Sequence, residues 1–255
     1  MPRKSTGEYK GPPTWLDPTK ELSLSQSPTF KKHEFIAQGM RALIAYGLKP
    51  RLAAEVMANA CLEASWGRNC YWYNAGGWKI TKAYADAYKR QNNTSPYWWK
   101  ARGNTDSGDA DWCFYRAFRS LEEFLIAWCE HFVPKPTETN LPYPGYREAG
   151  RKFWAGDERW FGDLILVGYK GGPSKRRMLG IRMLGMDEAN HPSVRDHIYM
   201  AREVLEIWAQ NLLRVDPDGA WGPKSRAAAR KFQAERNLAV TGELDSATLS
   251  ALAAV

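Results

Sequence analysis

The sequence predicts a mainly helical fold with one small β-hairpin, followed by a small bundle of three helices. Apolar residues recur at three- and four-residue spacings through most of the chain, which is the period of an amphipathic helix. Between residues 66 and 114 this pattern gives way to Gly, Asn, Tyr and Trp, which indicates turns and short strands. The excess of Lys and Arg lies entirely in residues 1–201. We therefore expect a flexible arm at residues 1–28, a larger domain at 29–200 and a small domain at 201–255.

Helix start and stop signals mark the larger domain. Thr29 is a candidate N-cap for the first helix, and Gly47 closes it. Pro50 suits the first turn of the next helix, which we expect to run to about Ser65. A glycine-rich basic loop is expected at residues 168–182. We expect helices at about residues 29–46, 50–65, 121–132, 147–167 and 193–213, and the last of these leads into the small domain.

The chain is basic, with a net charge of +8 and a pI of about 9.3. Such a protein is drawn to polyanions, which include nucleic acid, anionic membranes and anionic cell wall. The sequence shows no basic helix face beside a nucleic-acid-binding motif, and no run of the ~20 apolar residues that span a membrane. Its 12 Trp and 12 Tyr supply rings that either fill a core or stack on the faces of sugars. The cluster Lys175-Arg176-Arg177 is either a solvated face or a binding patch.

Metal and redox chemistry find little support. No two cysteines have CxxC spacing, so buried free thiols are expected, with disulfides as the alternative. The histidines form no HExxH motif, and neither a phosphate loop nor a GxSxG elbow is present. We therefore expect no metal and no cofactor. The cysteines and histidines of the chain are Cys61, Cys70, Cys113, Cys129, His33, His131, His191 and His197.

The strongest local feature is Leu-Glu-Ala-Ser-Trp-Gly at residues 62–67. We expect Glu63 near the carboxyl end of the second helix, continuing the buried stripe of Val56 and Ala60. Burial beside the negative end of a helix dipole favours the protonated form of a carboxylic acid. A glycosidase general acid needs that form near neutral pH. The alternative is a structural Glu held by local hydrogen bonds or by Arg68.

Glu63-Ala64-Ser65-Trp66-Gly67 resembles the Glu-Ser-x-Trp-Gly motif of the bacterial peptidoglycan glucosaminidases, the flagellar-muramidase type of lysozyme-like hydrolase. Residues 73–80, Tyr-Asn-Ala-Gly-Gly-Trp-Lys-Ile, are similar to the family's Asn-Leu-Phe-Gly-Ile-Lys segment, and residues 114–123 match its aromatic-acidic helix. The resemblance covers about residues 30–167. It implies a lysozyme-like glycoside hydrolase domain in which Glu63 is the general acid.

Two positions depart from the family pattern. Ala64 stands where the family has Ser, and Trp154 stands where it has a cleft-lining Tyr. An indole cannot supply a phenolic hydroxyl, so that role falls to another Tyr, such as Tyr73 or Tyr146. The side chains expected to contact sugar are Trp66, Tyr73, Asn74, Trp78, Tyr146 and Trp154.

Glycoside hydrolysis usually needs a second carboxylate, and in related enzymes an acid of the hairpin serves. The hairpin region here offers Asp109, which we prefer, then Asp111 and Asp106. These residues are also favoured in turns for backbone reasons. The acetamido group of the substrate is a further candidate for the internal nucleophile.

Residues 202–255 resemble the three-helix peptidoglycan-binding domain of many wall hydrolases, from Asp-Pro-Asp-Gly-Ala-Trp-Gly-Pro at 216–223 onward. Gly219 and Gly222 are expected at positive φ, and Pro223 in the first turn of a helix. Asn237 suits a left-handed C-cap and Asp245 an N-cap. Candidate wall-binding side chains are Trp221, Arg230, Gln233 and Asn237.

Together the resemblances imply a peptidoglycan hydrolase that cleaves β-1,4 bonds of the glycan, with an N-acetylglucosaminidase favoured. The alternatives are an N-acetylmuramidase or lytic transglycosylase on the same scaffold, and a wall-binding protein without catalysis. We expect bacterial peptidoglycan as the partner, a monomer, no nucleic acid and no membrane insertion. Residues 1–28 lack the apolar core of a secretory signal, so we expect delivery from the cytoplasm by another system, as for a phage endolysin or an injected antibacterial effector.

Overall fold

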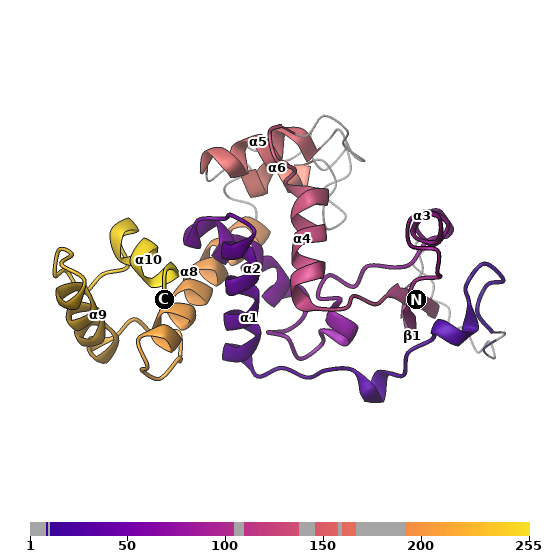
Figure 1. The fold of residues 1–255 in the computed structure, drawn as a ribbon, viewed down its shortest axis with the longest axis horizontal. Coiled ribbons are helices and arrows are strands. Elements are labelled where there is room, and N and C mark those ends of the chain that lie inside the picture. Colours follow the sequence, from indigo (N-terminus) through magenta and orange to yellow (C-terminus); the bar gives the residue numbers. More distant parts are fainter. Residues whose placement is uncertain (1–8, 10, 105–109, 138–145, 158–159, 167–191) are drawn as a thin grey trace.

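The computed structural model of the protein describes residues 9, 11–104, 110–137, 146–157, 160–166 and 192–255. The molecule is elongated, with the hairpin at one end and the last two helices at the other (Figure 1). This confirms a mainly helical fold with one small hairpin and a helical carboxy-terminal region. The elements are η1 (Pro18–Lys20), η2 (Leu24–Gln26), α1 (Lys32–Ala45), α2 (Pro50–Glu63), η3 (Tyr71–Tyr73), α3 (Lys82–Asn92), β1 (Trp98–Asn104), β2 (Ala110–Arg116), α4 (Leu121–Phe132), α5 (Arg147–Ala155), α6 (Trp160–Leu166), α8 (Pro192–Leu212), α9 (Pro223–Glu235) and α10 (Ser246–Ala253).

The main core lies where α1, α2, α4 and α8 meet. α2 packs along α8, and α1 contacts α2, α4 and α8. Phe35, Met57, Leu125 and Ile207 are fully buried there, one from each helix. Gly47 has a φ of 106°, which allows the sharp turn between α1 and α2 that its sequence position predicts. The same cluster of buried residues continues into α10, so the carboxy-terminal helices share this core.

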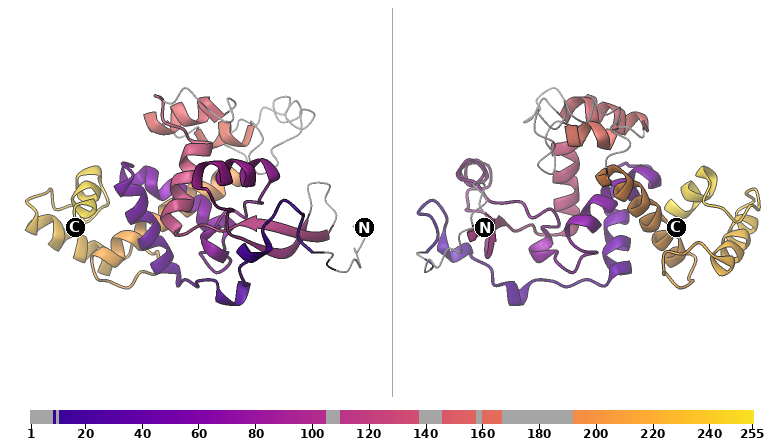
Figure 2. Two further views of the ribbon diagram at one scale, coloured as in Figure 1. Left: turned by 45° about the vertical axis from the view of Figure 1, so that its right-hand side comes forward. Right: turned by 180° about the vertical axis from the view of Figure 1, so that it is seen from behind.

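The hairpin has its own small core. β1 and β2 pair antiparallel, from Trp98 opposite Arg116 to Asn104 opposite Ala110. Leu16 packs beneath the hairpin with Trp98, and Trp98 Nε1 donates to the carbonyl of Asp17 at 2.9 Å. Residues 11–28, which the sequence places in a flexible arm, thus run along the hairpin and lead to α1 (Figure 2).

Three helical predictions need correction. The candidate N-cap Thr29 lies before the helix, because the N-cap of α1 is Lys31. The sequence gives no helix between residues 66 and 114, yet α3 occupies residues 82–92. Only Ala85 of this helix is buried, so an apolar stripe is missing, and local caps define its ends: Thr81 at the start and left-handed Asn93 at the finish. The single helix expected at about 147–167 is divided into α5 and α6, because Gly156 ends α5 at a φ of 73°.

α8 links the central helices to the carboxy-terminal region. It runs without interruption from Pro192 to Leu212, across the expected domain boundary between residues 200 and 201. Figure 1 shows it extending from the central helices to the carboxy-terminal ones. Within the part of the chain that the structure describes, no helix has both the length and the apolarity to cross a membrane.

Candidate functional site

Glu63 is the last residue of α2. Pro50 starts the helix in its first turn, as the sequence predicts. The side chain of Glu63 is exposed, so its expected place on the buried stripe is wrong. The stripe passes from Ala60 to Ala64 instead, one full helical turn further, and both are buried. A carboxylate at this position is open to a ligand from solvent.

The chain after Glu63 holds an unusual run of left-handed residues. Ser65, Trp66 and Gly67 have φ values of 47°, 62° and 87°. Trp72 and Tyr73 follow at 49° and 59°. Bulky side chains rarely adopt this conformation, which costs about 1–3 kcal/mol per residue and often marks a functional segment. The glycine is required for space as well, because a Cβ at Gly67 would lie 2.7 Å from the Phe35 ring.

Trp66 is half-buried, and a lysine of α1 lies over its ring. Lys32 Nζ of α1 lies 3.7 Å from the centre of its ring. The same Lys32 pairs with Glu203 of α8 at 2.6 Å. Lys32 thereby links the indole of Trp66, three residues after Glu63, to the helix that leads into the carboxy-terminal region.

Asn74, expected to contact sugar, is 2% exposed. Its Nδ2 donates to the carbonyls of Trp78 and Arg116, both at 2.9 Å, and its Oδ1 accepts from Trp78 N at 2.8 Å. These bonds close the loop of residues 74–78 onto β2. Asn74 therefore shapes this loop, and its assignment as a sugar-contacting side chain is withdrawn.

The fold brings Trp78 and Tyr146 together around His131 of α4. The ring centres of Trp78 and Tyr146 lie 5.3 and 5.7 Å from that of His131. Burial, and secondarily the Arg116 guanidinium, lowers the pKa of His131 to about 4. From its sequence context this histidine was expected to be at most a metal ligand. Its position on the stripe of Trp128 and Phe132 could have indicated the aromatic cluster.

The remaining candidates lie elsewhere. The indole N–H of Trp154 donates to the carbonyl of Val133 at 2.9 Å, so this group supports the fold. Asp106 and Asp109 lie outside the described residues. Asp111 is opposite Gly103 in the hairpin, and only its backbone is described.

Within the described ranges, no group of three His, Cys, Asp or Glu residues is arranged to hold a metal. All four cysteines are buried free thiols, and burial raises the pKa of the Cys61 thiol.

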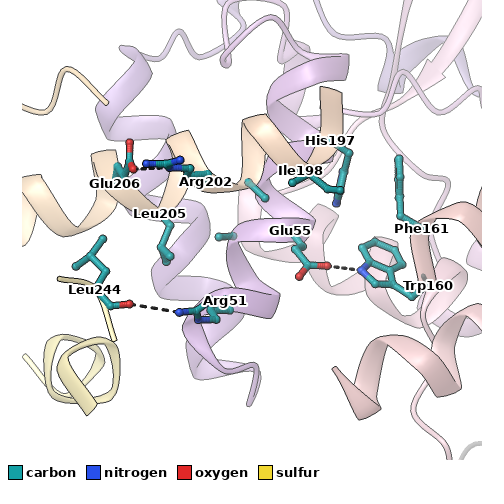
Figure 3. Close-up of a pocket in the computed structure, with 12 residues that line it drawn as sticks. Arg51, Glu55, Trp160, Phe161, His197, Ile198, Arg202, Leu205, Glu206 and Leu244 are labelled. Atoms are coloured by element: carbon teal, nitrogen blue, oxygen red, sulfur yellow. Dashed lines mark hydrogen bonds and ion pairs between the residues drawn. The ribbon is translucent and has the colours of Figure 1, made fainter. Parts of the chain in front are cut away.

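The carboxy-terminal helices dock directly on α2. Figure 3 shows Arg51 at the start of α2 reaching the carbonyl of Leu244, at 3.4 Å. Glu55, one turn later, accepts a hydrogen bond from the Trp160 indole of α6. A cavity of about 390 Å³ lies between α2, α6 and α8 at this junction. α2 therefore touches the carboxy-terminal region near its first turn and carries Glu63 at its last.

The carboxy-terminal caps follow the sequence predictions, with one exception. Gly219 has a φ of 81° and Asn237 one of 54°, and Asp245 caps α10 by accepting from Thr248 N. Gly222 does not have positive φ, since it is the extended N-cap of α9 at −90°. An N-cap residue lies before the helix and uses the extended region, which explains the difference.

The four candidate wall-binding residues differ in their exposure to solvent. Gln233 is fully buried and its amide is bonded to neighbouring turns, so it cannot contact a ligand and is withdrawn. Trp221 is half-buried, with its indole N–H bonded to the carbonyl of Gly242 at 3.0 Å. Arg230 and Asn237 are exposed, and Arg230 lies against the Gly242 turn. These two remain the accessible candidates.

Comparison with protein-family models matches residues 197–252 to the family described as "Putative peptidoglycan binding domain". The match begins inside α8 and ends in α10, so it covers the helices that dock on α2. It supports a cell-wall-binding region with peptidoglycan as its partner. Comparisons with curated proteins and with solved structures gave no match.

Proposed function

We propose that the chain binds peptidoglycan through residues 197–252 and hydrolyses β-1,4 bonds of its glycan with Glu63 as the general acid. The observation that carries the proposal is the geometry of α2. One helix contacts the wall-binding region through Arg51 and ends at Glu63. With a rise of 1.5 Å per residue, these 14 residues span about 20 Å. A glycan held by the carboxy-terminal helices thus stays within reach of the acid.

In the proposed reaction, Glu63 protonates the leaving glycosidic oxygen. An aspartate of the hairpin, or the acetamido group of the substrate, then acts on the opposite face of the sugar. Trp66, three residues after the acid, is the ring proposed to receive a sugar face, a role supported by its half-buried position with Lys32 over the ring. The left-handed residues from Ser65 to Tyr73 give the loop after the acid a defined shape.

The glucosaminidase resemblance favours the bond that leaves N-acetylglucosamine at the reducing end. A muramidase or a lytic transglycosylase would use the same general acid and release different products. The biological setting proposed is that of an endolysin or antibacterial lysin.

A second candidate function is wall binding without turnover. The exposure of Glu63 favours it, because the burial on which the general-acid role was expected to depend is absent. Entry of the substrate would have to exclude water from Glu63 for the hydrolase to act. The two functions differ in one measurable property, the release of fragments.

The test is digestion of purified peptidoglycan by the wild type and by Glu63→Gln, with products identified by mass spectrometry. The hydrolase predicts release of disaccharide fragments, reduced about 10²- to 10⁴-fold in Glu63→Gln. Glu122→Gln is the matched control, because Glu122 is also an exposed helical glutamate and lies on α4. A reducing N-acetylglucosamine, a reducing N-acetylmuramic acid or an anhydro sugar identifies the bond and the reaction.

Wall binding is measured in the same samples by co-sedimentation. We expect Glu63→Gln to pellet with the wall as the wild type does. Full activity in Glu63→Gln would remove Glu63 as the acid. Sedimentation without any release of fragments by the wild type would leave the second candidate function.

A further inference from the structure

A second cavity of about 390 Å³ lies between α3, the start of β1 and the start of α4. This volume is within the ~300–1,000 Å³ of ordinary small-molecule sites. Aromatic rings make up most of its wall: Trp72, Tyr73, Tyr84, Tyr88, Tyr97 and Phe118. Only Tyr73 of these was expected from the sequence to contact sugar. α3, which contributes Tyr84 and Tyr88, was not predicted at all.

The backbone that presents two of these rings is strained and firmly held. Trp72 and Tyr73 are the adjacent left-handed residues of η3. Trp72 N donates to Ser27 Oγ at 2.8 Å, and its indole N–H donates to the carbonyl of Ser23 at 3.2 Å. Phe118 N donates to the carbonyl of Trp72 at 3.0 Å. A strained pair of aromatic residues fixed from three sides indicates a wall shaped before a ligand arrives.

The polar groups of the cavity suit a neutral ligand rich in hydroxyls. Arg119 and Glu123 line it as an ion pair at 3.1 Å, so their charges offset each other. The phenol hydroxyls of the four tyrosines can each donate and accept a hydrogen bond. Burial raises the pKa of Tyr84, which keeps its hydroxyl protonated at neutral pH. A pyranose ring combines C–H faces that pack on aromatic rings with hydroxyls around its edge.

We propose that this cavity is a saccharide-binding subsite that takes an N-acetylhexosamine unit of the glycan. The identity of the glycan rests on the proposed function, whereas the saccharide chemistry rests on the cavity. Tyr88 on α3 and Tyr97 before β1 come from separate elements, so each can be tested alone. Tyr97 is 47% exposed, which makes it accessible to a ligand and tolerant of substitution.

The experiment measures binding of tri-N-acetylchitotriose to the full chain by isothermal titration calorimetry. All proteins carry Glu63→Gln, which prevents turnover of the probe. We expect Tyr88→Ala and Tyr97→Ala each to weaken binding by about 5- to 10-fold, the value of one well-placed ring contact. Tyr88→Phe keeps the ring and should weaken binding less than Tyr88→Ala. Tyr199→Ala on α8 is the control, because Tyr199 is 73% exposed and lies outside the cavity.

Circular dichroism and thermal unfolding confirm that each variant is folded before titration. The subsite is refuted if folded Tyr88→Ala and Tyr97→Ala bind as the Tyr199→Ala control does, or if the Glu63→Gln parent binds no trisaccharide at millimolar concentration. Its failure is separable from that of the hydrolase. If trisaccharide binding depends on Tyr88 and Tyr97 but the wild type releases no fragments from peptidoglycan, only the hydrolase proposal is refuted. If the wild type releases fragments but trisaccharide binding is unaffected by both substitutions, only the subsite proposal is refuted.

Discussion

Gln210 of α8 and Gln233 of α9 make the same set of side-chain hydrogen bonds in two successive turns. Each Oε1 accepts from the backbone N–H of a glycine nine residues later, at 2.9 and 2.8 Å. Each Nε2 donates to partners eight, ten and fifteen residues later. The carboxy-terminal region therefore repeats one helix–turn–helix unit, and the two copies share α9.

The backbone repeats along with the amides. The two glycines that donate, Gly219 and Gly242, both have positive φ, at 81° and 77°. Each helix is followed by a left-handed residue, Arg214 or Asn237, at 57° and 54°. Since both amides are buried and bonded at every position, they act as cross-links that fix the turns.

Gln233→Leu should destabilise the carboxy-terminal region. The change removes four hydrogen bonds and leaves Gly242 N and the Thr248 hydroxyl without their partner in a buried setting. Buried unsatisfied groups cost about 1–3 kcal/mol each, so we expect a loss of roughly 2–4 kcal/mol in the free energy of unfolding. Urea unfolding followed by circular dichroism measures it. A loss below about 0.5 kcal/mol would contradict the cross-link role.

Arg230→Ala should weaken wall binding and leave the stability of the carboxy-terminal region unchanged. Arg230 is exposed on α9 beside the Gly242 turn, so its removal leaves the core of the region intact. Its guanidinium can bind the carboxylates of peptidoglycan stem peptides. We expect co-sedimentation with the wall to weaken about 3- to 10-fold, consistent with one charge-assisted contact. The midpoint of thermal unfolding should stay within about 2 °C of the wild type. Unchanged sedimentation would exclude Arg230 from the wall contact, and Lys231→Ala, one residue away, is the charge-matched control.

The sequence predicts the fold well where local signals and core packing agree. α2, α4 and α8 combine clear apolar stripes with Pro or Ser at their starts, so their bounds were nearly right. α3 lacks an apolar stripe and depends on its caps and on the hairpin beside it. A helix without an apolar stripe cannot be distinguished from a series of turns by the periodicity of its apolar residues.

The candidate site was harder to predict for a geometric reason. The stripe of α2 runs through Ala60 and Ala64, and a spacing of three instead of four residues placed Glu63 on it wrongly. Asn74 and Gln233 were predicted from the sequence to contact the ligand, but both are buried. Asn74 bonds to Arg116, 42 residues away, and Gln233 bonds to Thr248, 15 residues away. A local sequence pattern does not reveal contacts between residues so far apart.

Gly67→Ala should impair both stability and turnover. Gly67 has a φ of 87°, and a new Cβ would also lie 2.7 Å from the Phe35 ring in the core. Strain and overpacking each cost about 1–3 kcal/mol. Because Gly67 follows Trp66 in the loop after Glu63, the loop must shift, and fragment release should fall more than the folded fraction does. Gly77→Ala is the matched control, since Gly77 has a φ of 59° but nothing within 4 Å of the new Cβ. Equal unfolding midpoints in the two variants would show that the Phe35 contact has no energetic effect.

His131 should make the protein less stable as the pH falls below 6.5. Burial, and then the Arg116 guanidinium, lowers the pKa of His131 to about 4 in the folded chain, whereas an unfolded histidine has a pKa near 6.5. Between those pH values the unfolded chain binds a proton that the folded chain does not, so unfolding is favoured by acid. The stabilisation is thus fully present above pH 6.5 and is lost as the pH approaches 4. His131→Phe keeps a ring beside Trp78 and Tyr146 and removes the titrating group. We expect the difference in unfolding midpoint, wild type minus variant, to decrease between pH 7 and pH 4.5, as measured by differential scanning calorimetry. Other acids and histidines affect both proteins alike, so a difference that is constant with pH would show that His131 does not titrate in this way.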